Sequence, residues 1–145
     1  MITVKQMLDE KGNAVWTISP EAKVFYALRL MAKKGVWALI VLKKGTVVGI
    51  LSERDYARKI ALMGRVSQDT PVRKIMTLGV YGVHSSSTSD ECMALMTEKR
   101  IRHLPVIEKG KLVGVISIGD VVKSIISHQK VTIQHLENYI MGKYQ

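Results

Sequence analysis

Apolar residues along the chain form two kinds of pattern, a helical spacing and short continuous runs. From Val24 to Met31 they recur at helical spacing, and Gly35, a residue type that ends helices, follows. Two short apolar runs come next, residues 38–42 and 47–51, separated by a turn sequence that contains glycine. Short apolar runs around such a turn are typical of a β-hairpin. This stretch therefore predicts a helix followed by two antiparallel strands.

The same order of patterns returns later in the chain, with apolar runs at 104–107 and 112–116. Sliding the sequence on itself by 65 residues aligns 15–60 with 80–125 without a gap. Such self-similarity indicates two copies of one supersecondary unit, each burying its apolar face against the other. Identical residues include Leu30 and Leu95, Leu39 and Leu104, Val41 and Val106, Gly49 and Gly114, Ser52 and Ser117, and Asp55 and Asp120.

Each unit is predicted to run strand, helix, strand, strand, helix, which gives a mixed α/β fold of two pseudo-symmetric repeats packed sheet to sheet. A weaker echo, offset by 68 residues, relates 4–8 to 72–76 and predicts a short opening helix for each unit. We expect residues 1–70 to form the first repeat with its N-terminal helix, and residues 71–127 the second. Apolar residues near helical spacing predict a helical tail over 128–145.

Two sequences predict where the longer helices begin. Ser19-Pro20-Glu21 offers an N-cap, a first-turn proline and a first-turn acid. In the second copy, Thr88 and Glu91 have the spacing of a capping box. We therefore expect the two equivalent helices to start directly after Ser19 and Thr88.

Composition and charge narrow the choice of partners. The 145-residue chain carries 22 Lys and Arg against 12 Asp and Glu, a net charge of +10 that favours an anionic partner. Cys92, the single cysteine, lies in an apolar helical pattern and is expected to be buried. With no disulfide possible, no signal-length apolar run and no stretch of about 18 apolar residues, we expect a cytoplasmic protein without a membrane segment.

Each unit repeats a glycine, a serine and an aspartate where its last strand meets its last helix. A serine there, Ser52 or Ser117, places a hydroxyl beside the unpaired N–H groups of the helix start, which suits a phosphate. Asp55 and Asp120, three residues on, could accept hydrogen bonds from a ribose diol. The same spacing is also an ordinary helix-capping motif, so both readings stay open.

Gly49 and Gly114 stand three residues before these serines. A glycine inside a strand leaves room for another backbone or a ring to approach closely. We therefore expect a second segment or a ligand to lie against each strand at this point.

These motifs carry a family resemblance. The stretches GILSERD, GVISIGD and IRHLPVIEKGKLVGVIS resemble CBS motifs, named for cystathionine β-synthase and paired as in a Bateman module. The resemblance covers about residues 4–126 and is closest to short stand-alone bacterial proteins. It implies two clefts between paired sheets that hold adenosine-containing ligands such as AMP, ADP, ATP, NAD or S-adenosylmethionine.

The resemblance also implies roles for individual residues. Aspartates would hold ribose hydroxyls, serines would meet phosphate or ribose oxygens, strand residues would enclose adenine, and basic residues would touch phosphates. We add two arginines after Ser52 as phosphate contacts and one histidine at an adenine-lining position. The predicted ligand-binding residues are Asp55, Asp120, Ser52, Ser117, Ile18, Val83, Leu104, Arg102, His103, Arg54, Arg58 and His84.

The two copies differ at several of these positions. Opposite Arg102-His103 the first unit has Trp37-Ala38, and opposite Glu53-Arg54 the second unit has Ile118-Gly119. Because cations are needed to neutralise a phosphate, the two clefts are predicted to differ in affinity or ligand preference. Trp37 itself is expected in the core or at a dimer interface, with ligand stacking as the alternative.

Motifs for catalysis are missing from the sequence. It has no Ser-His-Asp or Cys-His set, no HExxH motif and no P-loop, and its four histidines and one cysteine lack metal-ligand spacing. We expect a non-enzymatic adenine-nucleotide sensor without a catalytic cofactor, which forms a homodimer and acts on an unidentified downstream protein. The alternatives are a nucleic-acid-associated protein, suggested by the net charge, and a structural dimerisation module with empty clefts.

Overall fold

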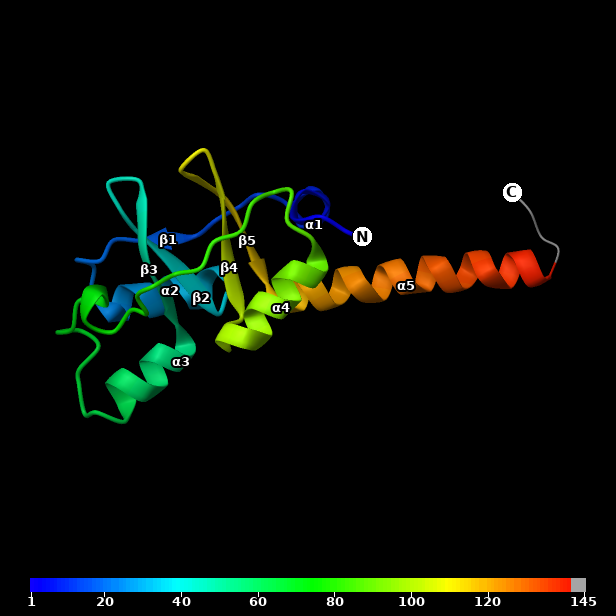
Figure 1. Ribbon diagram of the computed structural model, residues 1–145. Helices are drawn as coiled ribbons and strands as arrows, with labels where there is room; N and C mark the ends of the chain where they lie inside the picture. The colour runs from blue at the N-terminus through cyan, green and yellow to red at the C-terminus, as the bar shows by residue number, and fades with distance from the viewer. Residues whose placement is uncertain (142–145) are drawn as a thin grey trace.

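The computed structural model describes residues 1–141 as two repeats lying side by side, each with a small sheet and its own helices (Figure 1). Residues 142–145, the end of the predicted tail, lie outside the described residues. The first repeat holds a sheet of order β1-β2-β3, and the second holds the pair β4-β5. The predicted mixed α/β class with paired repeats is confirmed.

The first repeat follows the predicted element order. β1 pairs parallel with β2, and β2 pairs antiparallel with β3. The hairpin turn at Lys44 and Gly45 has φ values of 51° and 80°, the left-handed conformation that glycine adopts without strain. Gly35, with φ 65°, ends α2 as predicted. The bounds are β1 Thr17–Ile18, α2 Val24–Lys34, β2 Ala38–Lys43, β3 Thr46–Ser52, α3 Glu53–Tyr56 and a π-helical segment Ala57–Ala61.

The second repeat differs at both of its ends. Its expected first strand is reduced to one parallel bridge between Val83 and Val106. Its last helix continues past residue 127 as a single helix, so the predicted tail is an extension of the repeat. The bounds are α4 Ser89–Lys99, β4 His103–Glu108, β5 Lys111–Ser117 and α5 Ile118–Ile140.

Within the described chain, no helix has both the length and the apolar content to cross a membrane.

One of the two predicted helix starts is correct. The Thr88 side chain accepts the backbone N–H of Glu91 at 3.2 Å and caps α4. The start predicted at Ser19 is wrong, because α2 begins at Val24. Tertiary pairing takes the place of the side-chain cap there, since the N–H of Val24 donates to the carbonyl of Thr70 at 2.9 Å.

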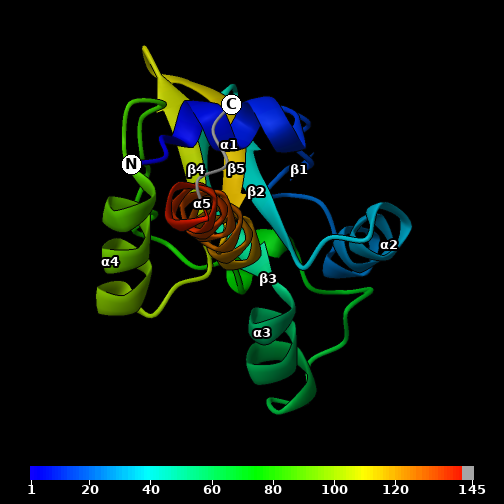
Figure 2. The same cartoon turned by 90° about the vertical axis from the view of Figure 1, so that its right-hand side faces the viewer.

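The opening segments are exchanged between the repeats. Helix α1 (Val4–Lys11) precedes the first repeat in sequence, but its apolar residues are buried in the core of the second. The short 3-10 helix Val72–Lys74 and Ile75 are placed in the opposite way, with Val72 and Ile75 in the core of the first repeat. Figure 2 shows α2 and α4 on opposite flanks, with the sheets between them and α1 across one end. The exchange makes the two repeats one folding unit, and equivalent antiparallel bridges secure it: Thr3 to Thr88 and Lys23 to Pro71.

The two strand glycines make room for these exchanged segments. A Cβ at Gly49 would lie 2.8 Å from Sδ of Met76 and 3.0 Å from the carbonyl oxygen of Thr77. A Cβ at Gly114 would lie 2.8 Å from the Leu8 side chain. The predicted close approach is therefore confirmed, and the approaching group is the opening segment of the other repeat.

Candidate ligand cleft between the repeats

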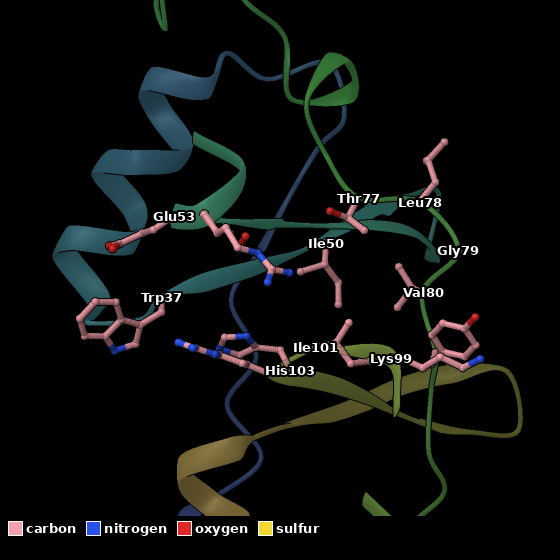
Figure 3. Close-up of a pocket in the computed structure, with 14 residues that line it drawn as sticks. Trp37, Ile50, Glu53, Thr77, Leu78, Gly79, Val80, Lys99, Ile101 and His103 are labelled. Carbon is pink, nitrogen blue, oxygen red and sulfur yellow. The ribbon is translucent and has the colours of Figure 1, made fainter. Parts of the chain in front are cut away.

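A cavity of about 510 Å³ lies where the two repeats meet. Ile50 from β3 and Ile101 from the segment before β4 point toward each other across it (Figure 3). The lining comes from the end of the first hairpin, from the connection into the second repeat, and from the start of β4: Trp37, Ile50, Ser52, Glu53, Arg54, Thr77, Leu78, Gly79, Val80, Tyr81, Lys99, Ile101, Arg102 and His103.

Positive charge surrounds this cavity. Arg54, Lys99 and Arg102 place three basic side chains in its lining, against the single carboxylate of Glu53. The Lys99 amino group lies 5.1 Å from the centre of the Tyr81 ring, within range of a cation–π contact. An apolar centre with cations around it suits a ligand that has a flat ring and an anionic tail.

The Ser52–Asp55 corner borders the cavity at the start of α3. The two residues form a reciprocal capping box, in which the Ser52 Oγ accepts the N–H of Asp55 at 3.2 Å and Asp55 Oδ2 accepts the N–H of Ser52 at 2.9 Å. Asp55 Oδ1 accepts the Thr77 hydroxyl at 2.9 Å and lies 3.3 Å from the Lys59 amino group. Asp55 is 6% exposed. Ser52 lines the cavity, although its hydroxyl also donates to Asp55 Oδ2 at 3.1 Å, and both oxygens of Asp55 are bonded within the protein.

The equivalent Ser117–Asp120 corner has the same capping box and a different neighbour. Lys11, at the end of α1, donates to Asp120 Oδ2 at 2.6 Å and to the Val115 carbonyl at 2.8 Å. Burial raises the pKa of Asp120, but the hydrogen bonds from Lys11 and Ser117 outweigh it and leave the pKa below its ordinary 3.8. The second corner is thus covered by a cation of the chain itself.

His103 lies between the two corners. His103 is the first residue of β4, where it is the strand partner of Ser117 at the end of β5, and it also lines the cavity. Burial lowers the pKa of His103 from its ordinary 6.5, and the charges of Lys11 and Arg102 lower it further against the opposing effect of Asp120. The imidazole is therefore neutral at neutral pH and offers one donor and one acceptor to a ligand.

The structure brings four of the predicted contacts together in this cavity: Ser52, Arg54, Arg102 and His103. Arg58, one turn beyond Arg54, is exposed and lies outside the lining. The cavity therefore joins the end of one hairpin to the start of the other, which no single repeat provides.

The predicted adenine-lining residues lie elsewhere. Val83 and Leu104 belong to the buried core of the second repeat, and Ile18 packs against the core of the first. The exposed His84 has its Nδ1 3.0 Å from the carbonyl oxygen of Ile107. At the two core positions, only backbone groups could meet a ligand without repacking.

Ten of the 14 lining residues were not predicted as ligand contacts, among them Ile50, Ile101 and three aromatic or basic residues, Trp37, Tyr81 and Lys99. Trp37 was expected chiefly in the core or at a dimer interface, but it is 69% exposed and lies at one end of the cavity. Tyr81 and Lys99 were not predicted as ligand contacts, although the alignment of the two repeats places an aromatic residue and a lysine at the same positions in both. At the offset of 65 residues they correspond to Trp16 and Lys34, and the Lys34 amino group lies 4.2 Å from the centre of the Trp16 ring.

Cys92 lies outside the lining of this cavity. Cys92 is fully buried, as predicted, and burial together with the charge of Glu91 raises its pKa to about 11. Over residues 1–141, no three His, Cys, Asp or Glu side chains gather in a way that could hold a metal ion.

Comparison with known proteins gives consistent matches. The profile of the CBS domain family matches residues 11–62 and 72–127. The mitochondrial CBS domain-containing protein CBSX3 of Arabidopsis thaliana is 36% identical over 152 residues, covering 98% of this chain and 73% of the relative. A solved CBS-domain structure from Burkholderia ambifaria is 50% identical with a TM-score of 0.84, covering 88% of this chain and 96% of that one. The CBS domain pair of protein MJ0100, solved in complex with 5-methylthioadenosine and S-adenosyl-L-methionine, shares the fold at 21% identity and a TM-score of 0.78, with 88% and 98% of the two chains covered.

Proposed function

The chain belongs to the CBS domain family, and on this premise we propose that it is a non-enzymatic regulatory module that binds an adenosine-containing ligand, AMP, ADP, ATP or NAD, between its repeats. The observation that carries the proposal is the cavity between the repeats, with its apolar centre and three cations around it. Adenosine nucleotides combine a flat ring with an anionic tail. The domain pair of MJ0100 holds two adenosine compounds, which supports the same ligand class here.

We assign the parts of the ligand to parts of the cavity. The adenine lies between Ile50 and Ile101, and the phosphates lie toward Arg54 and Arg102. The hydroxyl of Ser52 and the neutral imidazole of His103 complete the polar contacts. For Asp55 to hold the ribose, its bond from Thr77 is exchanged for one from a ribose hydroxyl. For Asp120 to do the same, the ligand must displace Lys11.

Regulation in this proposal follows from the ligand touching both repeats. A ligand that fits one relative orientation better than another shifts the protein toward that orientation. The connection 77–81 lines the cavity and joins the repeats, so it moves with the change. A homodimer partner and a downstream protein in the cytoplasm receive the signal.

Calorimetric titration of the chain with AMP, ADP, ATP and NAD tests the proposal. We expect saturable binding of at least one of them below millimolar ligand. Arg54→Ala should weaken that binding about 10-fold, because a charged hydrogen bond to phosphate is lost. Arg58→Ala is the matched control, an exposed arginine on the same turn-and-helix segment, and should leave the affinity unchanged.

Two results would contradict the proposal. One is the absence of saturable heat with all four ligands at millimolar concentration. The other is an equal loss from Arg54→Ala and Arg58→Ala, because a general loss of positive charge would then explain the effect. Binding of a nucleic acid with steep salt dependence would support the nucleic-acid alternative instead.

A further inference from the structure

The second half of α5 leaves the body of the protein. The buried residues of this 23-residue helix are Val121 and Ser124, both within its first two turns. Figure 1 shows the rest of α5 projecting away from the two sheets. A helix segment of about 12 residues is marginal in water without packing against another element. The projecting segment therefore needs a contact that residues 1–141 of one chain do not supply.

One face of this helix carries a heptad seam. Its positions are separated by four and three residues in strict alternation, the spacing of a and d sites in a coiled coil. Exposure is 40% at Val122, 47% at Ile126 and 55% at Ile133, large values for apolar side chains. The seam consists of Val122, Ile126, Gln129, Ile133, Leu136 and Ile140.

We infer that α5 pairs with α5 of a second copy of this chain as a parallel two-stranded coiled coil. A heptad seam packs its side chains into holes formed by another heptad seam, and a second copy presents the identical one. The three isoleucines occupy a positions, and Leu136 occupies a d position. Branched residues at a with leucine at d favour a parallel dimer over higher oligomers. The inference concerns only this surface and does not depend on nucleotide binding.

Gln129 decides the orientation. In a parallel pair its amide meets the same amide of the partner, and each can donate to the other. In an antiparallel pair that overlaps the whole seam, Gln129 faces Ile133 of the other copy, and its amide loses its partners. Antiparallel pairing would bring Lys123 near Glu137 of the other copy, but exposed ion pairs contribute little. The cost of the unpaired amide is larger, so the parallel arrangement is favoured.

A pair of substitutions tests the seam. Ile133 and Val131 are 55% and 54% exposed on the same helix, but only Ile133 lies in the seam. Sedimentation of the nucleotide-free wild-type chain should show a dimer. Ile133→Lys should raise its dissociation constant about 100-fold or more, because each dimer would bury two charges. Val131→Lys should leave it unchanged. A monomeric wild type, or equal behaviour of the two variants, would overturn the inference.

Cysteine cross-linking tests the orientation. Leu136→Cys, which keeps Gln129 in place, should form a disulfide-linked dimer under mild oxidation, because parallel pairing brings the two copies of residue 136 together. Val131→Cys on the outer face should not, and the wild-type chain is a control because Cys92 is buried. If Leu136→Cys remains uncross-linked while the chain sediments as a dimer, the parallel register is wrong.

Discussion

The two strand-to-helix corners have the same glycine, serine and aspartate and the same capping box, yet they have different surroundings. Asp55 is bonded to a hydroxyl from the connection between the repeats, and its serine opens onto the cavity. Asp120 is bonded to the amino group of Lys11. The comparison teaches that the duplicated motif builds the corner, whereas the exchanged segment that crosses it decides whether the corner is open.

A glycine and a lysine account for this difference. At the offset of 68 residues that relates the opening segments, Lys11 corresponds to Gly79. Gly79 lines the open cavity without a side chain, and its φ of 66° is the left-handed conformation that glycine favours. The first corner stays accessible because nothing projects from this position, and the second is filled because Lys11 reaches across it.

Removal of the two aspartates should break the equivalence of the corners most strongly. Asp55→Ala is expected to lower the free energy of unfolding by roughly 2–4 kcal/mol, since it removes the carboxylate half of the capping box, the acceptor of the Thr77 hydroxyl and the ion pair with Lys59. Asp120→Ala should cost about 1 kcal/mol, because the corner is more exposed. Urea unfolding of both variants measures the difference, and equal losses would show that the buried network adds nothing to the cap.

The two glycines should respond unequally to the same substitution. Gly49→Ala places a Cβ against the backbone oxygen of Thr77 as well as against Met76, so a loss of about 1–3 kcal/mol is expected. Gly114→Ala meets only side-chain atoms of Leu8, which can shift, and should cost less than about 1 kcal/mol. Thermal and urea unfolding report both. A larger loss at Gly114 would contradict this account of the close approach.

Lys11→Met should leave the Ser117–Asp120 capping box without its ion pair. Loss of the cation removes the main effect that lowers the pKa of Asp120, so this pKa should rise, as carboxyl titration by NMR can measure. The stability loss should be only ~0–1 kcal/mol, because the ion pair is partly exposed. This stability difference between wild type and Lys11→Met should be fully present above the ordinary pKa of 3.8. It should vanish as the pH falls through the folded pKa of Asp120. An unchanged pKa would show that Lys11 does not hold the corner in solution.

The smallest effect concerns His103 and pH. Its pKa is lowered in the folded protein, so the unfolded chain takes up the proton first as the pH falls through about 6.5. The free energy of unfolding should therefore decrease between pH 7 and the folded pKa and then level off. His103→Gln should remove this dependence, whereas His128→Gln on the exposed part of α5 should keep it. Urea unfolding at several pH values gives the comparison.

Local patterns predicted most of the secondary structure. The hairpins, their glycine turns and the caps at Thr88, Ser52 and Ser117 follow from short-range backbone chemistry, which neighbouring residues control. The start of α2 did not follow, because Thr70 pairs with Val24 only after the chain has folded back. Predictions failed where a distant segment supplied the hydrogen-bond partner.

The candidate site divides in the same way. The duplication and the two corners could be predicted from the sequence alone, because periodicity and capping depend on residues close in the chain. Arg102 was predicted from the resemblance to CBS motifs, and Arg54 from its place just after Ser52. Only the tertiary structure decided that the opening segments exchange, that Asp55 is buried, and that Lys11 covers the second corner. The physical reason is that each of these depends on packing between residues far apart in sequence, and two nearly identical repeats leave that packing undetermined until both are folded together.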